Sequence, residues 1–233
     1  MQIILVPGFW LTADSWSEVT AHLEAAAYDV RALTLPGLES IDSPRAGIGL
    51  SDHVAAVVAA IDEAAEPVVL VGHSGGGAII HGALDARPDR VAHAIYVDSA
   101  PLGEGASIND ALPAVGDEIP LPPWSGFEPD DLVDLTDELR DRFRAVAVPQ
   151  PRAVASDGMQ LHDERRFRVP ATVIACEFPS AMILEWVGSG QPFVAELARM
   201  EAVSYVDLPT GHWPQFTKPA ELAALILAAV DGP

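Results

Sequence analysis

A serine lies in a glycine-rich turn directly after an apolar run. The stretch 67–80 reads PVVLVGHSGGGAII, which places Gly72 and Gly76 two residues to either side of Ser74. G-x-S-x-G between a buried strand and a helix is the pattern that presents a serine as a nucleophile on a sharp turn. Glycines at these two positions keep Cβ atoms out of the crowded turn. We therefore predict that Ser74 is a nucleophile and that the Gly75 amide, at a helix N-terminus, stabilises an oxyanion.

A phosphate-binding loop is the alternative interpretation of these glycines. Such a loop requires G-x-x-x-x-G-K-[ST] or G-x-G-x-x-G. The glycines at 72, 75, 76 and 77 match neither pattern, and Lys218 is the only lysine of the chain. In a third interpretation Ser74 is merely a small residue of a tight turn. The apolar run before the turn and the Ala/Ile-rich stretch after it favour the nucleophile.

A serine hydroxyl needs a nearby base to act as a nucleophile near neutral pH. His212 is the leading candidate, because it lies in LPTGHWPQ directly after the apolar run VSYVDL and follows the serine along the chain. His73 is adjacent to Ser74, but on such a turn its side chain should point away, so we assign it no role as a base. The other histidines lie in predicted helices, a predicted strand or an irregular segment: His22, His53, His81, His93 and His162.

The elements that must position these residues are short strands alternating with helices. The apolar runs IILVPG, DVRALTL, PVVLVGH and VAHAIYVDSA are separated by helical patterns over 14–27, 51–65 and 76–87. The pattern resumes later with PATVIAC, a helical stretch around 193–200, AVSYVDL and a last helix over 219–230. Strands that alternate with helices predict an α/β fold with a mainly parallel sheet covered on both faces.

The alternation breaks over residues 101–168, which are rich in proline, glycine and acidic residues. We predict a core formed by 1–100 and 169–233, with 101–168 inserted as a cap that closes over Ser74. One helix is predicted in the cap, over about 130–146. Its apolar side chains share one face: Leu132, Leu135, Leu139 and Phe143.

With these motifs the chain resembles the α/β-hydrolase superfamily over nearly its whole length. LVPGFW is similar to the family's oxyanion loop, LTLPGLES to the loop after the next parallel strand, and PTGHWPQFTKP to its late histidine loop. The small size and GHSGGG resemble the serine esterase branch that includes plant methyl-ester hydrolases and hydroxynitrile lyases. The resemblance implies the α/β-hydrolase fold with a small helical cap. It also implies a second oxyanion donor, the backbone amide of Phe9.

The resemblance leaves two candidates for the acid that orients His212. The family usually has an aspartate after the strand that here reads ATVIAC, where this chain has EFPS. Asp98 ends the preceding strand, the position of the acid in some branches, haloalkane dehalogenases among them. Glu177 ends the later strand, and its longer side chain could reach the histidine. We prefer Asp98 and keep Glu177 as the alternative. Many hydrolases have a non-catalytic aspartate at the position of Asp98, where it caps a turn. A third outcome is therefore that neither carboxylate orients His212.

These features together predict a serine hydrolase that cleaves a small, largely apolar carboxylic ester, lactone or thioester through an acyl-enzyme. Trp10, Trp213 and Phe216 flank the motif loops and are predicted to line the substrate pocket, with ordinary packing as the alternative. Two other functions stay open. One is a lyase like the hydroxynitrile lyases, whose cap lysine has no counterpart in 101–168. The other is a non-catalytic ligand-binding protein on the same fold.

Composition narrows the range of partners. The 233 residues include 13 basic and 34 acidic ones, a net charge of -21 that repels nucleic acids and anionic membranes. No apolar run reaches the length of about 18 residues that spans a bilayer. We expect a small-molecule substrate and no nucleic-acid or membrane partner, with a homodimer as one possibility.

Cofactors and export signals are not expected either. Cys176 is the only cysteine, which excludes an intramolecular disulfide and a multi-cysteine metal site. The sequence has no dinucleotide-binding fingerprint and no metal-ligand motif, so we predict no cofactor and no metal. Met1 is followed directly by the predicted strand QIILV, without a basic and then apolar leader. We therefore expect a cytoplasmic protein.

Overall fold

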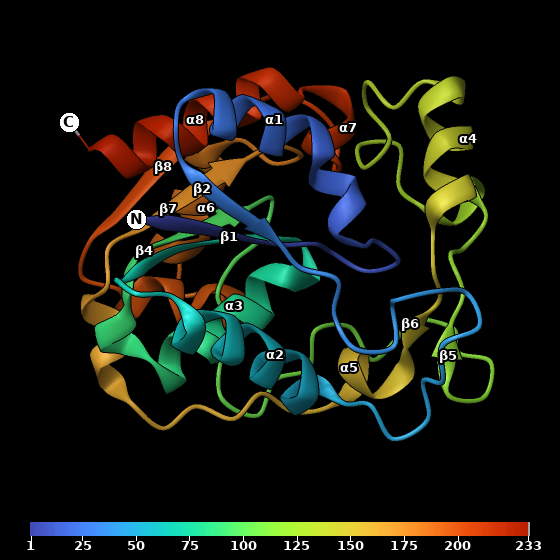
Figure 1. Ribbon diagram of the computed structural model, residues 1–233, viewed down its shortest axis with the longest axis horizontal. Helices are drawn as coiled ribbons and strands as arrows, with labels where there is room; N and C mark the ends of the chain where they lie inside the picture. The colour runs from blue at the N-terminus through green and yellow to red at the C-terminus, as the bar shows by residue number, and fades with distance from the viewer. Residues whose placement is uncertain (233) are drawn as a thin grey trace.

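A six-stranded parallel sheet forms the centre of the computed structural model, which describes residues 1–232. The strands lie in the order β2-β1-β3-β4-β7-β8, and all neighbouring pairs are parallel (Figure 1). Their bounds are Gln2–Val6 for β1, Asp29–Ala32 for β2, Val68–His73 for β3, Val91–Val97 for β4, Ala171–Ala175 for β7 and Val203–Asp207 for β8. The predicted α/β class is confirmed.

Helices cover both faces of the sheet. In Figure 1, α1 and α8 lie above the sheet, and α2 and α3 lie below it. The α-helices of the core are α1 (Ser17–Ala25), α2 (Leu50–Glu63), α3 (Gly75–Ala86), α6 (Ser180–Gly188), α7 (Pro214–Thr217) and α8 (Pro219–Asp231). Single turns of 3-10 helix occur at Ala13–Trp16, Pro88–Arg90, Trp124–Gly126, Glu164–Arg168, Pro192–Val194 and Leu197–Arg199. None of the helices formed by residues 1–232 is both long and apolar enough to cross a membrane.

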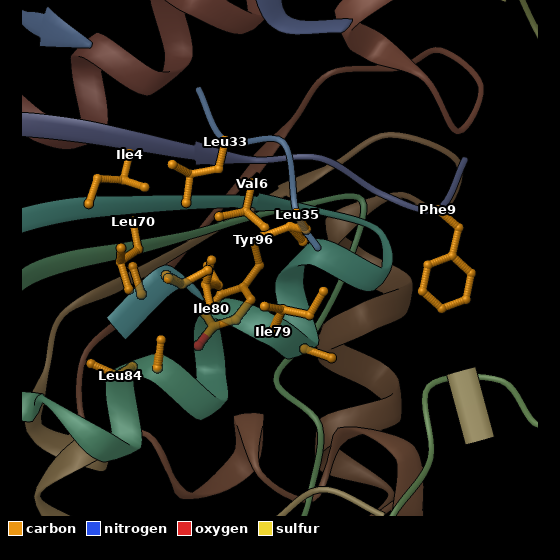
Figure 2. Close-up of a cluster of buried hydrophobic side chains, with 14 of the residues drawn as sticks. Ile4, Val6, Phe9, Leu33, Leu35, Leu70, Ile79, Ile80, Leu84 and Tyr96 are labelled. Atoms are coloured by element: carbon orange, nitrogen blue, oxygen red, sulfur yellow. The ribbon is translucent and has the colours of Figure 1, made fainter. Parts of the chain in front are cut away.

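The apolar core has two parts, one on each face of the sheet. Successive residues of a strand point to opposite faces, so Ile4 of β1 enters one cluster while Ile3 and Leu5 enter the other. Figure 2 shows the first cluster, in which Ile4 and Leu70 lie near Ile80 of α3. Burial on both faces explains why the central strands read as continuous apolar runs in the sequence.

The segment between β4 and β7 contains the remaining elements. These are β5 (Glu118–Ile119), α4 (Asp137–Val146), β6 (Gln150–Pro151) and α5 (Arg152–Ser156). β5 pairs antiparallel with β6. In Figure 1, α4 and this strand pair lie to the right, beyond the carboxyl ends of the parallel strands, whereas α5 packs against α2. The first part of the segment predicted as a cap thus lies at the strand ends, and its last part covers a helix of the core.

Three local predictions differ from the structure. The helix expected over 130–146 begins only at Asp137, because Thr136 accepts a hydrogen bond from the Leu139 amide at 3.3 Å and caps the helix there. The stretch around 193–200 forms two short 3-10 turns instead of a helix. The sequence analysis did not predict α6, since its residues SAMILEWVG lack the polar face that marks an amphipathic helix.

The turn from β3 into α3 is as tight as the glycine pattern predicts. Ser74 has φ 52° and ψ -125°, a left-handed backbone that costs about 1–3 kcal/mol outside glycine. A Cβ at Gly72 would lie 2.5 Å from the Gly76 carbonyl oxygen, and one at Gly76 would lie 2.6 Å from the carbonyl oxygen of Pro7. Both glycines are therefore needed for the backbone to pass itself and the loop after β1.

A buried ion network links the last part of the predicted cap, at Arg166, to α3. The Arg166 guanidinium lies 3.1 Å from Asp85 of α3 and 3.1 Å from Glu196. Glu196 also lies 3.2 Å from His81 of α3, whose other ring nitrogen lies 2.9 Å from the Tyr96 hydroxyl. Because the charges are paired and hydrogen-bonded, their burial beneath the chain is tolerated.

The first prediction concerns the crowded turn. We expect Gly76→Ala to lower the free energy of unfolding by about 1–3 kcal/mol or more, because the new Cβ collides with backbone that cannot move independently. Gly188→Ala is the matched control, since a Cβ there meets nothing within 4 Å and Gly188 ends a helix. We expect this control to leave stability unchanged or raise it by up to about 1 kcal/mol. Urea denaturation followed by circular dichroism measures both, and equal losses in the two variants would contradict the steric explanation.

Candidate active site

Ser74, His212 and Asp98 form one chain of hydrogen bonds. His212 Nε2 lies 2.8 Å from Ser74 Oγ, and His212 Nδ1 lies 2.6 Å from Asp98 Oδ2. The three residues follow β3, β8 and β4, whose carboxyl ends meet at one edge of the parallel sheet. With Nδ1 protonated toward the carboxylate, Nε2 is free to accept the proton of the serine hydroxyl.

Asp98 is held by backbone as well as by the histidine. Its Oδ1 accepts hydrogen bonds from the amides of Cys176 and Glu177, at 3.1 Å and 3.0 Å. Its backbone φ of 43° turns the chain at the end of β4 and directs the carboxylate across to β7. Although burial opposes the charge, the hydrogen bond and charge of His212 and the Glu177 amide lower the pKa of Asp98. Asp98 is therefore a carboxylate at neutral pH.

Glu177, the alternative acid, lies close to the histidine but outside hydrogen-bonding distance. Its Oε2 is 3.8 Å from His212 Nδ1, whose hydrogen bond goes to Asp98. Burial, together with the negative charges of Asp131 and Asp98, raises the pKa of Glu177 to about 7. The structure therefore brings Asp98 against the imidazole and places Glu177 beside that pair as a carboxyl group that titrates near neutral pH.

The charges around His212 favour its protonated form. Burial lowers the pKa of this imidazole, but the hydrogen bond and charge of Asp98 and the further charges of Glu177 and Asp131 outweigh it. The pKa of His212 is raised as a result. The histidine is thus suited to hold a proton for part of a reaction cycle and to release it afterwards.

His73 supports the histidine loop from inside the protein. Its ring is fully buried, with Nε2 2.6 Å from the His212 carbonyl oxygen and Nδ1 3.2 Å from the Gln215 side-chain amide. Burial and the nearby His212 lower the pKa of His73 to about 3, so the ring is neutral and donates from Nε2. The sequence analysis assigned no base role to His73 and missed this positioning contact, for which the sequence has no signal beyond proximity to Ser74.

The cap holds the same loop from outside. The His212 amide donates to the Asp131 carbonyl oxygen at 2.8 Å, and the Gly211 amide donates to the Val133 carbonyl oxygen at 3.1 Å. A Cβ at Gly211 would collide with the Asp131 carbonyl oxygen. Neither Gly211 nor Asp131 was among the predicted site residues. Glycine directly before the histidine was the available signal, since it permits close approach of another backbone.

The two predicted oxyanion donors lie beside the serine. Phe9 and Gly75 line the same cavity as Ser74. Within residues 1–232, their amides form none of the backbone hydrogen bonds of turns, loops or helix ends. A Cβ at position 75 would lie 2.7 Å from the Phe9 ring, so glycine there allows the ring to pack over the start of α3. Two amide donors at this position can stabilise negative charge on an oxygen bound next to Ser74.

The cavity above Ser74 has a volume of about 460 Å³ and a largely aromatic wall. Trp10, Phe127 and Trp213 line it, with ring centroids 5.9 Å apart for the first pair and 5.3 Å apart for the second. The Trp10 indole nitrogen donates to the Ile119 carbonyl oxygen at 3.0 Å, which fixes the ring in the wall. Phe216, also predicted to line the pocket, does not reach it and packs against Phe143 instead.

A larger groove of about 840 Å³ lies between α2, α3 and residues 157–163. Ser51 and His162 both line it, but neither is hydrogen-bonded to the other, and Asp157 and Asp85 are engaged in capping backbone amides. Because a nucleophile needs its base within hydrogen-bonding distance, volume alone does not make this groove the active site. The smaller cavity at Ser74 has the required chemistry.

Asp98, Glu177 and His212 also have the composition of a metal site. Their ligand atoms lie within 4.8 Å of one another. Ligands about 2.0–2.2 Å from a tetrahedral zinc are about 3.3 Å apart, however, whereas His212 Nδ1 and Asp98 Oδ2 are 2.6 Å apart. The observed separation is that of a charge-assisted hydrogen bond, so the donor set does not fit a metal without rearrangement.

Comparison with known proteins agrees with this fold. A pyrethroid hydrolase of Sphingobium wenxiniae is 27% identical over 99% of this chain and 88% of its own length. A carbendazim-hydrolysing esterase of a Nocardioides species is 26% identical over 64% of this chain and 69% of its own length. The crystal structure of an extracellular α/β-hydrolase from a Paenibacillus species matches with a TM-score of 0.76 and 19% identity, over 98% of both chains.

The fold is that of α/β-hydrolases. The model of the alpha/beta hydrolase family matches residues 3–225, nearly the whole chain. The protein therefore belongs to the alpha/beta hydrolase family, as the sequence motifs predicted.

The second prediction concerns the pKa of His212. We expect Glu177→Gln to lower it, because a nearby negative charge is removed, and Asp98→Asn to lower it further, because the hydrogen-bonded carboxylate is lost. Titration of the histidine ring resonances by NMR measures the pKa in wild type and both variants. Glu63→Gln on the surface is the control and should leave the value unchanged. A His212 pKa that does not respond to Asp98→Asn would contradict the electrostatic assignment.

Proposed function

We propose that the protein is a serine hydrolase that cleaves a small, largely apolar carboxylic ester, lactone or thioester. The hydrogen-bonded chain from Asp98 through His212 to Ser74, at the floor of an aromatic cavity, carries this proposal. The names of two relatives, a pyrethroid hydrolase and a carbendazim-hydrolysing esterase, support hydrolysis of an ester-like bond by this chain as well.

The reaction begins with Ser74 as nucleophile. His212 Nε2 takes the hydroxyl proton as Ser74 Oγ attacks the carbonyl carbon, and the carbonyl oxygen becomes negative. The Phe9 and Gly75 amides donate to that oxygen. When the tetrahedral intermediate collapses, His212 returns the proton to the leaving oxygen or sulfur, and the acyl group stays on Ser74.

Water completes the cycle. It attacks the acyl-enzyme carbonyl carbon while His212 Nε2 takes one of its protons. His212 then returns this proton to Ser74 Oγ as the second tetrahedral intermediate breaks down and releases the carboxylic acid. Throughout, Asp98 keeps the Nδ1 proton directed toward itself and stabilises the imidazolium. His73 and the cap carbonyl of Asp131 hold the loop, so the ring does not turn between the two half-reactions.

The cavity accounts for an apolar substrate. Trp10, Phe127 and Trp213 supply apolar surface for such a substrate, and the acidic groups of Glu128 and Asp131 in the lining disfavour an anionic one. Lyase chemistry that depends on a cap lysine has no support here, because Lys218 donates to the Pro209 carbonyl oxygen at 2.6 Å and does not line the cavity. A purely ligand-binding role does not require the hydrogen-bonded alignment of Asp98, His212 and Ser74.

The third prediction tests the nucleophile. A fluorophosphonate probe should label wild type at Ser74, and p-nitrophenyl acetate and butyrate should be hydrolysed. We expect Ser74→Ala to abolish labelling and to lower kcat by about 10³-fold or more, since the covalent route is lost. Ser99→Ala serves as the control, because this neighbouring hydroxyl donates to the Ser74 carbonyl oxygen and lies outside the proton path. Peptide mass spectrometry locates the label, and a folded wild type with neither label nor turnover would contradict the proposal.

The fourth prediction separates the two acids. Asp98→Asn should lower kcat by about 10²–10⁴-fold, because the imidazole loses the group that fixes its tautomer. Glu177→Gln should cost less than about tenfold. Activity requires neutral His212 and rises with pH through its pKa, so removal of the Glu177 charge should move this rise to lower pH. The pH profile of kcat/KM measures this shift, and a larger loss in Glu177→Gln than in Asp98→Asn would reverse the assignment.

A further inference from the structure

A second cavity, of about 450 Å³, adjoins the one above Ser74. We refer to it as the α6 cavity, because Ile183 and Trp186 of α6 form part of its wall. Ser74, Phe9 and Gly75 line only the first cavity. Four residues line both: Asp98, Ser99, Ala100 and His212. The imidazole and the chain after β4 thus form the boundary between two adjacent spaces.

The wall of the α6 cavity is apolar and rich in aromatic rings. Trp186 lies between Phe178 and Phe193, with ring centroids 5.2 Å and 5.3 Å apart and steep angles of 66° and 72° between the planes. Val173 of β7 and Val194 complete the apolar lining. Such a surface packs well against an aromatic ring or a branched hydrocarbon. The polar residues of the lining are Asp98, Ser99, Glu177 and His212, and all of these except Glu177 also line the first cavity.

Apolar side chains at and beside the α6 cavity are partly exposed to solvent. None of the residues of α6 is buried, although the helix is almost entirely apolar. Of the residues that line the cavity, Phe178 is 39% exposed and Phe193 59%. Removing apolar surface from water contributes about 25 cal/mol per Å². The exposed apolar surface of this cavity therefore favours the binding of an apolar ligand.

The chemistry assigns one half of an ester to each cavity. The carbonyl oxygen must lie at the Phe9 and Gly75 amides, which line only the first cavity, so the acyl group enters there. The leaving oxygen must reach Nε2 of His212, which lines both cavities. A substituent on that oxygen therefore starts at the boundary with the α6 cavity, which His212 and Ala100 also line.

The wall opposite the sheet is held in place by the buried ion network. Phe193 and Val194 lie directly before Glu196, whose carboxylate pairs with Arg166 and His81. This pairing attaches the chain just after the turn at 192–194 to α3. Phe193 and Val194 are thereby held in the wall of the cavity, although α6 is not buried.

We propose that the α6 cavity binds the alcohol part of the substrate, and that this alcohol is bulky and apolar, with an aromatic ring. The proposal rests on the proposed function and narrows it: the acyl group occupies the cavity lined by Trp10 and Trp213, and the alcohol part occupies the α6 cavity. It assigns Ile183, Trp186 and Val194 as residues that determine specificity.

A series of acetate esters tests the proposal, with methyl, butyl, benzyl and naphthylmethyl as the alcohol part. We expect kcat/KM of wild type to rise about fourfold for each further buried methylene, the equivalent of about 0.8 kcal/mol. Ile183→Trp should fill the cavity and remove this rise, while leaving methyl acetate within about twofold of wild type. Leu184→Trp is the matched control, since Leu184 is the next residue on α6 and does not line the cavity.

A second variant covers the case in which Ile183→Trp fails to fold. Trp186→Ala should lower kcat/KM for benzyl acetate at least tenfold and leave methyl acetate unchanged, with folding checked by circular dichroism. A rise with alcohol size that persists in both folded variants would overturn the proposal. The same holds if both variants change the dependence on acyl length in a series of methyl esters, because the cavity would then bind the acyl group.

Failure of the proposed function itself is distinguishable. Binding of 2-naphthylmethanol to wild type, measured by calorimetry, reports on the α6 cavity without turnover, and Ile183→Trp should weaken it at least tenfold while Leu184→Trp should not. Binding of this kind in a protein that hydrolyses no ester would show that the cavity takes apolar alcohols and would overturn the hydrolase. Absence of binding in an active enzyme would overturn the assignment of the α6 cavity alone.

Discussion

The close passage of the backbone at the end of β3 is the constraint on which the rest of the site depends. Gly72 and Gly76 leave room for the chain to cross itself, and Ser74 adopts φ 52° between them. The same crowding extends to the loop after β1, where a Cβ at Gly8 would lie 2.7 Å from the His73 ring. The turn therefore sets the distance between the serine and the Phe9 amide, because both loops are packed without spare volume.

The position of the imidazole depends on two layers of the protein at once. From the core, His73 donates to the His212 carbonyl oxygen, and Asp98 accepts a hydrogen bond from the His212 ring. From the cap, the carbonyl oxygen of Asp131 accepts the His212 amide proton. The segment predicted as a cap thus holds the loop of His212 in addition to lining the cavity. A hydrogen-bonded loop with partners on both sides gives the precise geometry that proton transfer requires.

Much of this arrangement could be predicted from the sequence, and particular residues show where prediction ends. The G-x-S-x-G turn pointed to Ser74, and the place of His212 after a late strand and after the serine pointed to His212; the structure places the two side chains 2.8 Å apart. Asp98 and Glu177 could only be ranked, since each ends a neighbouring strand. Phe216 follows Trp213 by three residues, yet it packs behind the pocket, because the turn of α7 directs it toward Phe143.

The sequence by itself determined the α/β class, the strained turn and the order of serine and histidine, because periodicity and glycine spacing act over a few residues. The tertiary structure alone decided which carboxylate meets His212. Asp98 turns at φ 43° and is anchored by the Cys176 and Glu177 amides of the adjacent strand, and no local pattern encodes that pairing. It also decided that the apolar α6 remains exposed beside the site, since burial depends on segments distant in the chain. Contacts between strand ends and loops far apart in sequence arise only when the sheet assembles.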